Sequence, residues 1–80
     1  MKLKILAFGI SKDILGASSC TIDIDDQATV AQLKKKLLNE YKDFHKLTSL
    51  MIAVNSEYAT TETLLKENDE IALIPPVSGG

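Results

Sequence analysis

Hydrophobic and polar residues alternate along the first nine positions of the chain. Every second residue from Leu3 to Ala7 is apolar, whereas two lysines share the opposite face with Leu6 and Phe8. A period of two residues is typical of a strand with one buried face. The sequence therefore predicts a strand over residues 1–9, with Leu6 and Phe8 on its solvent-facing side.

The longest helical pattern follows Thr29. This residue is a good N-cap, and Gln32 three positions later completes a capping-box pattern. Three consecutive lysines lie on the other face of this predicted helix and are interpreted as a solvated surface. The apolar residues of the stripe recur at helical spacing, at Val30, Leu33, Leu37, Leu38, Tyr41 and Phe44.

Shorter elements surround this helix. Gly16 ends a predicted helical turn, and Asn68 suits a turn because it tolerates a left-handed backbone. Continuous apolar sequence from Leu50 to Val54 predicts a central strand covered on both faces. The other predicted elements are a helical turn over 11–16, a half-buried strand over 18–25, a short edge strand over 58–59, a helical turn over 61–65 and a last strand over 70–74.

Two strands, a helix and further strands, in this order, predict an α+β fold. A helical crossover lets the first and last strands pair in parallel at the centre of the sheet. This is the ubiquitin-like β-grasp arrangement, a mixed sheet of four or five strands with one main helix on one face. We expect residues 1–76 to form this domain and residues 77–80 to form an extended tail.

Composition excludes several classes of protein. The chain has 80 residues and a net charge of −2, and it lacks the arginine pairs and basic clusters that nucleic acid binding favours. Its apolar runs are too short for a membrane helix. The single cysteine, Cys20, excludes an internal disulfide and a cysteine-based zinc site, which favours a cytoplasmic location. We expect Cys20 to be a small buried hydrophobe and His45 a surface residue, with no metal site.

The C-terminal residues carry the candidate chemistry. Pro75 and Pro76 end sheet pairing and hold the chain extended. The next four residues can reach about 13 Å from the domain at about 3.3 Å per residue. Gly79 and Gly80 have no side chains and can enter a channel too narrow for a Cβ atom.

The one functional group of this tail is the terminal carboxylate of Gly80. An ionised carboxylate becomes an acyl donor only after activation, for example by adenylation. The chain has no phosphate-binding glycine loop, so we expect a separate enzyme to use ATP for this step and the chain itself to bind no cofactor.

Residues 69–80, with the sequence DEIALIPPVSGG, resemble the C-terminal signature of the small subunit of molybdopterin synthase. Residues 4–8, 29–33 and 53–55 fit the same sulfur-carrier family. The resemblance implies that an adenylyltransferase related to ubiquitin-activating enzymes activates Gly80, which then becomes a thiocarboxylate. It also implies that the tail, formed by Pro75, Pro76, Val77, Ser78 and Gly79, inserts into a large subunit.

The same resemblance implies a division of labour. The large subunit holds the catalytic residues, so this chain is not an enzyme on its own, and two small and two large subunits form a heterotetramer. Sulfur passes to cyclic pyranopterin monophosphate in molybdenum cofactor biosynthesis. Two other functions stay open, namely a sulfur carrier for thiamin synthesis or RNA thiolation, and a ubiquitin-like modifier joined to lysines through Gly80.

The strand pattern adds a docking surface to this hypothesis. If the first and last strands are parallel neighbours, Phe8 and Ile74 lie near the point where the tail departs. With Leu6 and Tyr58 they would form an exposed apolar patch suited to a partner interface.

Overall fold

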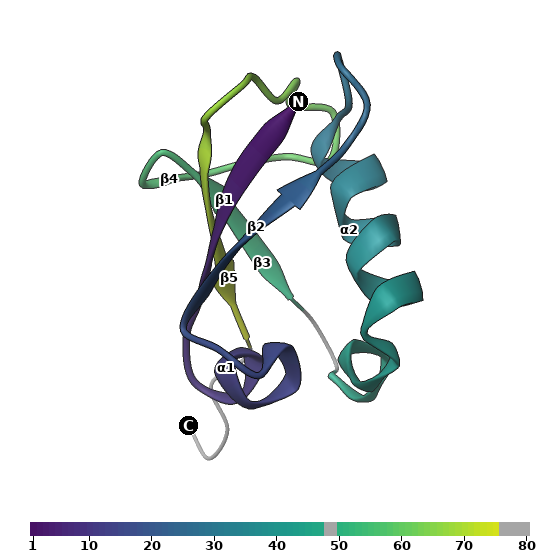
Figure 1. The fold of residues 1–80 in the computed structure, drawn as a ribbon, viewed down its shortest axis with the longest axis vertical. Coiled ribbons are helices and arrows are strands. Elements are labelled where there is room, and N and C mark those ends of the chain that lie inside the picture. Colours follow the sequence, from purple (N-terminus) through teal and green to yellow (C-terminus); the bar gives the residue numbers. More distant parts are fainter. Residues whose placement is uncertain (48–49, 76–80) are drawn as a thin grey trace.

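The computed structural model describes residues 1–47 and 50–75 of the chain. One long helix crosses one face of a five-stranded sheet whose strand order is β2-β1-β5-β3-β4 (Figure 1). In chain order the elements are β1 (Lys2–Ala7), α1 (Ile10–Leu15), β2 (Ser19–Asp23), α2 (Val30–Glu40), the 3₁₀ helix η1 (Lys42–Lys46), β3 (Met51–Val54), β4 (Glu57–Tyr58) and β5 (Glu70–Ile74).

The first and last strands lie side by side at the centre of the sheet. They pair in parallel, with Lys4 opposite Glu70 and Ala7 opposite Leu73, whereas the other strand pairs are antiparallel. The α+β fold and the ubiquitin-like β-grasp topology predicted from the sequence are therefore confirmed, with five strands.

The core lies between the sheet and α2. The predicted alternation of β1 is confirmed, because Leu3 and Ile5 are fully buried while Lys2 and Lys4 are exposed. Burial of each large side chain of this kind contributes about 1.5–3 kcal/mol, so the sheet face that α2 covers holds most of the stabilising contacts. The largest fully buried apolar side chains are Leu3, Ile5, Leu33, Leu37, Ile71 and Leu73.

Helix α2 begins as the sequence predicts. The Gln32 amide donates to the Thr29 hydroxyl at 3.4 Å, and the Thr29 amide donates to Gln32 Oε1 at 2.8 Å. The helix ends earlier than the apolar stripe, because Tyr41 leaves the helical conformation with φ −125°. Phe44 is nevertheless buried, since η1 turns it back into the core, where its ring meets Tyr41 edge to face.

The helical turn predicted over residues 61–65 is wrong. This segment runs alongside the start of α2, where the carbonyls of Thr61 and Thr63 accept hydrogen bonds from the amides of Ala31 and Val30. The first amides of a helix have no partner within it, and their demand for acceptors outweighs the local helical preference of the segment.

Other predicted strands are present in the structure, but their first and last residues differ from the prediction. The edge strand is Glu57–Tyr58 rather than 58–59, and the strands expected over 1–9 and 18–25 are shorter at both ends. Asn68 has the left-handed backbone that its turn requires, with φ 69°. Within residues 1–47 and 50–75, no helix has the length and apolar character needed to cross a membrane.

Candidate functional site

The described chain ends beside the turn between β1 and α1. A Cβ atom placed on Gly9 would lie 3.4 Å from the Pro75 side chain, so the two residues lie against each other. Gly9 has φ +54°, a conformation that L side chains rarely adopt. We call Ile74 and Pro75 the tail root. Residues 76–80, and with them the roles predicted for Pro76, Val77, Ser78, Gly79 and Gly80, lie outside the described residues.

A buried serine holds the tail root in place. The Ser11 side chain is fully buried, accepts a hydrogen bond from the Phe8 amide at 3.0 Å, and contacts the carbonyl oxygens of Phe8 and Leu73. The contact with Leu73, at 3.2 Å, joins the start of α1 to the strand that leads into the tail. Ser11 therefore fixes where β5 ends relative to β1.

We expect Ser11→Ala to lower the free energy of unfolding by about 1–2 kcal/mol, because it leaves the Phe8 amide and the Leu73 carbonyl without this partner. Chemical denaturation of the purified chain measures the effect. Ser18→Ala is the matched control, since Ser18 is exposed and should lose almost nothing. Equal stability of both variants would contradict the positioning role of Ser11.

An apolar surface lies on the sheet face turned away from α2. The strand register places Leu6 opposite Ala72, Ala53 opposite Ala72 and Tyr58, and Met51 opposite Ile74. Continued by one residue, the register of β1 sets Phe8 beside Ile74. We call the larger members of this surface the outer patch: Leu6, Phe8, Met51, Tyr58 and Ile74.

Exposure identifies the outer patch as unusual. Phe8 is 51% exposed, Met51 49% and Tyr58 69%, whereas Leu6 and Ile74 are half-buried. Large apolar side chains gathered on one exposed face often mark an interaction surface. The structure thus brings together the four residues singled out from the sequence, while their role in binding stays a prediction.

Met51 is the member that the sequence reasoning missed. The continuous apolar run from Leu50 to Val54 predicts a strand covered on both faces, and this is wrong, because β3 is next to the edge strand and Met51 is half exposed. A run without alternation gives no sign of which side chains face solvent.

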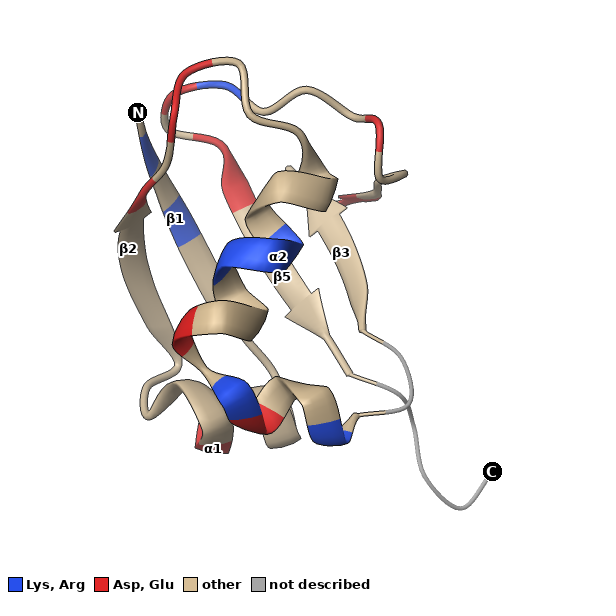
Figure 2. Cartoon of the chain, turned by 90° about the vertical axis from the view of Figure 1, so that its right-hand side faces the viewer, with Lys and Arg blue, Asp and Glu red and all other residues tan. Residues whose placement is uncertain are grey.

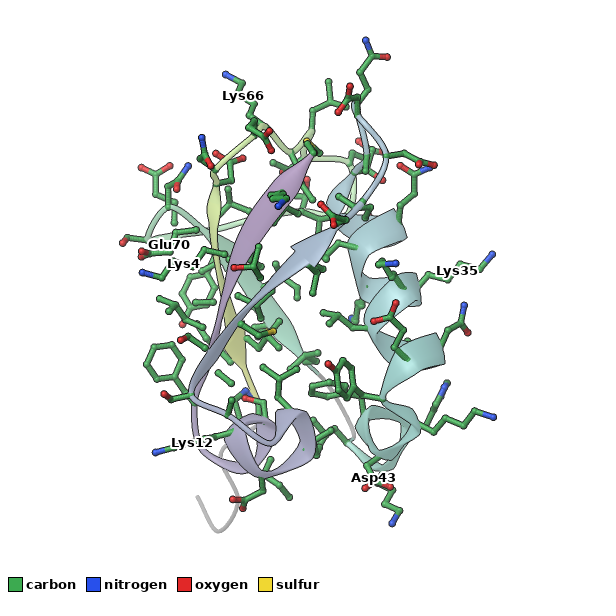
Figure 3. The ribbon with its side chains drawn as sticks, viewed as in Figure 1. Lys4, Lys12, Lys35, Asp43, Lys66 and Glu70 are labelled. Atoms are coloured by element: carbon green, nitrogen blue, oxygen red, sulfur yellow. The ribbon has the colours of Figure 1, made fainter. Side chains whose placement is uncertain are left out.

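Charged residues border the outer patch without entering it. Lys4 and Glu70 project from the same side of the sheet toward the end remote from α1, and Lys12 projects from α1 itself (Figure 3). The parts of β3 and β5 nearest α1 carry no charged residues (Figure 2). This bordering of an apolar centre by charges is typical of protein interfaces.

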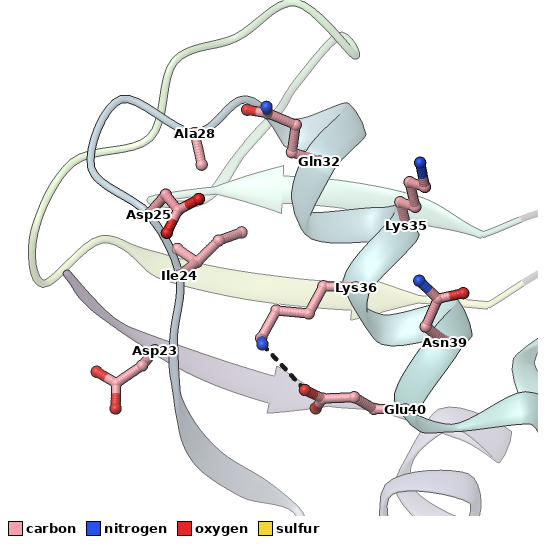
Figure 4. Close-up of a pocket in the computed structure, with 9 residues that line it drawn as sticks. All are labelled: Asp23, Ile24, Asp25, Ala28, Gln32, Lys35, Lys36, Asn39 and Glu40. Atoms are coloured by element: carbon pink, nitrogen blue, oxygen red, sulfur yellow. Dashed lines mark ion pairs between the residues drawn. The ribbon is translucent and has the colours of Figure 1, made fainter.

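A separate hollow lies between the end of β2 and α2. It has a volume of about 620 Å³, and its lining mixes charges of both signs, among them the Lys36–Glu40 ion pair at 3.0 Å (Figure 4). It does not adjoin the tail root, so we assign it no part in the tail chemistry.

Two nucleophilic or basic side chains also lie away from the tail root. His45 is exposed on η1, as predicted. Cys20 packs against the core beside Ile5, and burial, together with the negative charge of Glu40, raises the pKa of its thiol above the ordinary value. A raised pKa favours the neutral thiol, which is a poor nucleophile, so the interpretation of Cys20 as a small hydrophobe is consistent with its environment.

The sequence matches known proteins along its whole length. Residues 5–80 match the model of the ThiS family. The chain is 40% identical over 83 residues to the molybdopterin synthase sulfur carrier subunit of Dictyostelium discoideum, an alignment that covers 99% of this chain and 96% of the relative.

Solved structures share the fold. SAMP1, a small archaeal modifier protein from Haloferax volcanii, superposes with a TM-score of 0.85 at 24% identity, with full coverage of both chains. One chain in a complex of subunits 1 and 2 of the molybdopterin-converting factor from Helicobacter pylori is 28% identical, with a TM-score of 0.69 and full coverage of both chains.

Proposed function

Because the chain belongs to the ThiS family, we propose that it is the sulfur-carrier small subunit of a molybdopterin synthase. The observation that carries the proposal is that β5 ends at Ile74, within the outer patch, and is followed directly by the sequence PPVSGG. The subunit names of the relatives and the H. pylori complex support this assignment.

The chemistry resides in Gly80. A carboxylate oxygen attacks the α-phosphorus of ATP in a separate adenylyltransferase, and pyrophosphate leaves. Hydrosulfide then attacks the acyl carbon, the bond from that carbon to the AMP phosphate oxygen breaks, and AMP departs, leaving a thiocarboxylate at the chain end. This sulfur passes to cyclic pyranopterin monophosphate, water restores the carboxylate, and a second cycle supplies the second sulfur.

The large subunit supplies the groups that this domain lacks. An 80-residue chain has room for one core, and the outer patch offers an apolar surface rather than a catalytic cleft. In this proposal, residues 76–80 extend from the tail root into the large subunit while the outer patch binds its surface, and two copies of each subunit form a heterotetramer.

Intact-mass measurement of the chain, purified from its native host with the activating enzyme present, tests the proposal. We expect the mass to rise by the difference between one sulfur and one oxygen, with the change confined to the C-terminal fragment, and the large subunit to co-purify. Gly-Gly remnants on lysines of other proteins, without a thiocarboxylate, would instead assign the chain as a modifier. A thiocarboxylate without the large subunit would assign it to another sulfur pathway.

A further inference from the structure

A second apolar surface lies on the other side of the tail root. It is a hollow of about 320 Å³ between α1 and η1, whose apolar walls are Ile10, Ile14 and Leu47. Ile10 is 50% exposed at the first position of α1, while the other two side chains are half-buried. We call this hollow the α1 groove.

The α1 groove adjoins the outer patch through the turn against which the tail root packs. Phe8 belongs to the outer patch, Ile10 to the groove, and Gly9 between them contacts Pro75. The chain therefore leaves the domain between two apolar surfaces. A partner that encloses an extended chain from Pro75 onward must cover the surface on both sides of that point.

The charges of the α1 groove indicate the chemistry of the occupant. Lys46 is paired with Asp43 at 3.3 Å. Asp13 also lines the groove, and within residues 1–47 and 50–75 it has no ion-pair partner. One exposed carboxylate beside an apolar hollow is complementary to an apolar side chain flanked by a cation.

We propose that the α1 groove is a second docking site for the large subunit, which inserts an apolar side chain there and places an adjacent arginine or lysine against Asp13. This inference rests on the proposed function and extends it, because the partner then holds the carrier on both sides of the tail root. Contact on two sides restricts rotation of the domain about the tail and so aims residues 76–80 along one direction.

Calorimetric titration of the full chain with the large subunit of the same organism tests the inference. We expect Ile10→Asp to weaken the affinity at least about 10-fold, because a carboxylate would be desolvated in an apolar contact and repelled by Asp13. Ala31→Asp is the matched control, since Ala31 is exposed in the first turn of α2, at the opposite end of the molecule, and should leave the affinity unchanged (Figure 1).

A second measurement guards against a folding defect in the variant. In a titration of the wild-type chain followed by amide NMR, the amides of α1 and Leu47 should shift or broaden together with those of the outer patch. Asp13→Lys should weaken binding in a salt-dependent manner, since it reverses the proposed charge contact.

Three results would overturn the inference. One is wild-type affinity of Ile10→Asp while Phe8→Asp is impaired, which would leave the proposed function intact. Another is altered self-association of Ile10→Asp in sedimentation, which would assign the groove to a second copy of the chain. The third is a shift of the α1-groove amides on removal of residues 76–80, which would assign it to the chain's own tail. If wild-type chain fails to bind the large subunit, the proposed function itself fails.

Discussion

Deletion of Gly80 is expected to lower the rate of sulfur transfer by at least about 100-fold while the domain stays folded. The shortened chain still ends in a carboxylate, but that carboxylate lies about 3.5 Å nearer the tail root along an extended chain. Misplacement of a reacting group by 1 Å can already cost about 100-fold in rate. The deletion removes none of the core residues that the structure describes, so we expect stability to stay the same.

The rate of molybdopterin formation from chemically thiocarboxylated chains measures this effect. A chain with one glycine appended after Gly80 is the matched control. Its terminal carboxylate lies one residue farther from the tail root than in the wild type, so sulfur transfer should be similarly slow. Thermal unfolding of both variants should match the wild type. If the deletion variant turned over at the wild-type rate, the hypothesis that sulfur transfer needs the chain end at one fixed distance from the tail root would be refuted.

The fold could be predicted from the sequence wherever local and tertiary preferences agree. The alternation in β1 gave the correct buried face, and the capping box of Thr29 and Gln32 gave the correct start of α2. Both signals are local, because strand faces follow a two-residue period and a cap joins residues three positions apart.

The sequence predictions were wrong where the local structure depends on residues far away in the chain. The segment at Thr61 and Thr63 forms a tight turn rather than a helix, and its carbonyls accept hydrogen bonds from the first amides of α2, some 30 positions earlier in the chain. The local sequence of this segment does not predict its hydrogen bonds with α2. In the same way, the exposure of Met51 depends on the place of β3 near the sheet edge, which the apolar run from Leu50 to Val54 does not encode.

The candidate site also has one part that local sequence patterns predict and one part that they do not. Leu6, Phe8 and Ile74 could be grouped from the sequence, because strand alternation and the parallel pairing of the first and last strands place them on one face. Tyr58 was added to this group from the sequence, and the pairing of β4 with β3 places it on the same face. The α1 groove could not, since it arises from the packing of η1 beside α1, two short elements whose contact no sequence period predicts.

Replacement of Phe8 by aspartate should weaken binding to the large subunit by about 30-fold or more. Phe8 is the exposed aromatic residue nearest the tail root, and aromatic side chains at the centre of an interface commonly contribute about 2 kcal/mol or more. The variant adds the cost of desolvating a carboxylate in an apolar contact. Because the ring is already half exposed in the free chain, the free energy of unfolding should change much less than the binding free energy.

Phe8→Leu separates the loss of apolar contact from a defect in folding. Leucine keeps most of the apolar surface and should retain most of the affinity, whereas the aspartate variant should lose it, with both chains equally stable in thermal unfolding. Affinity is measured with the unmodified carboxylate form, so that binding is read independently of sulfur transfer. Equal affinity of the aspartate and leucine variants would remove the outer patch from the interface, and the large subunit would then hold the carrier through its tail alone.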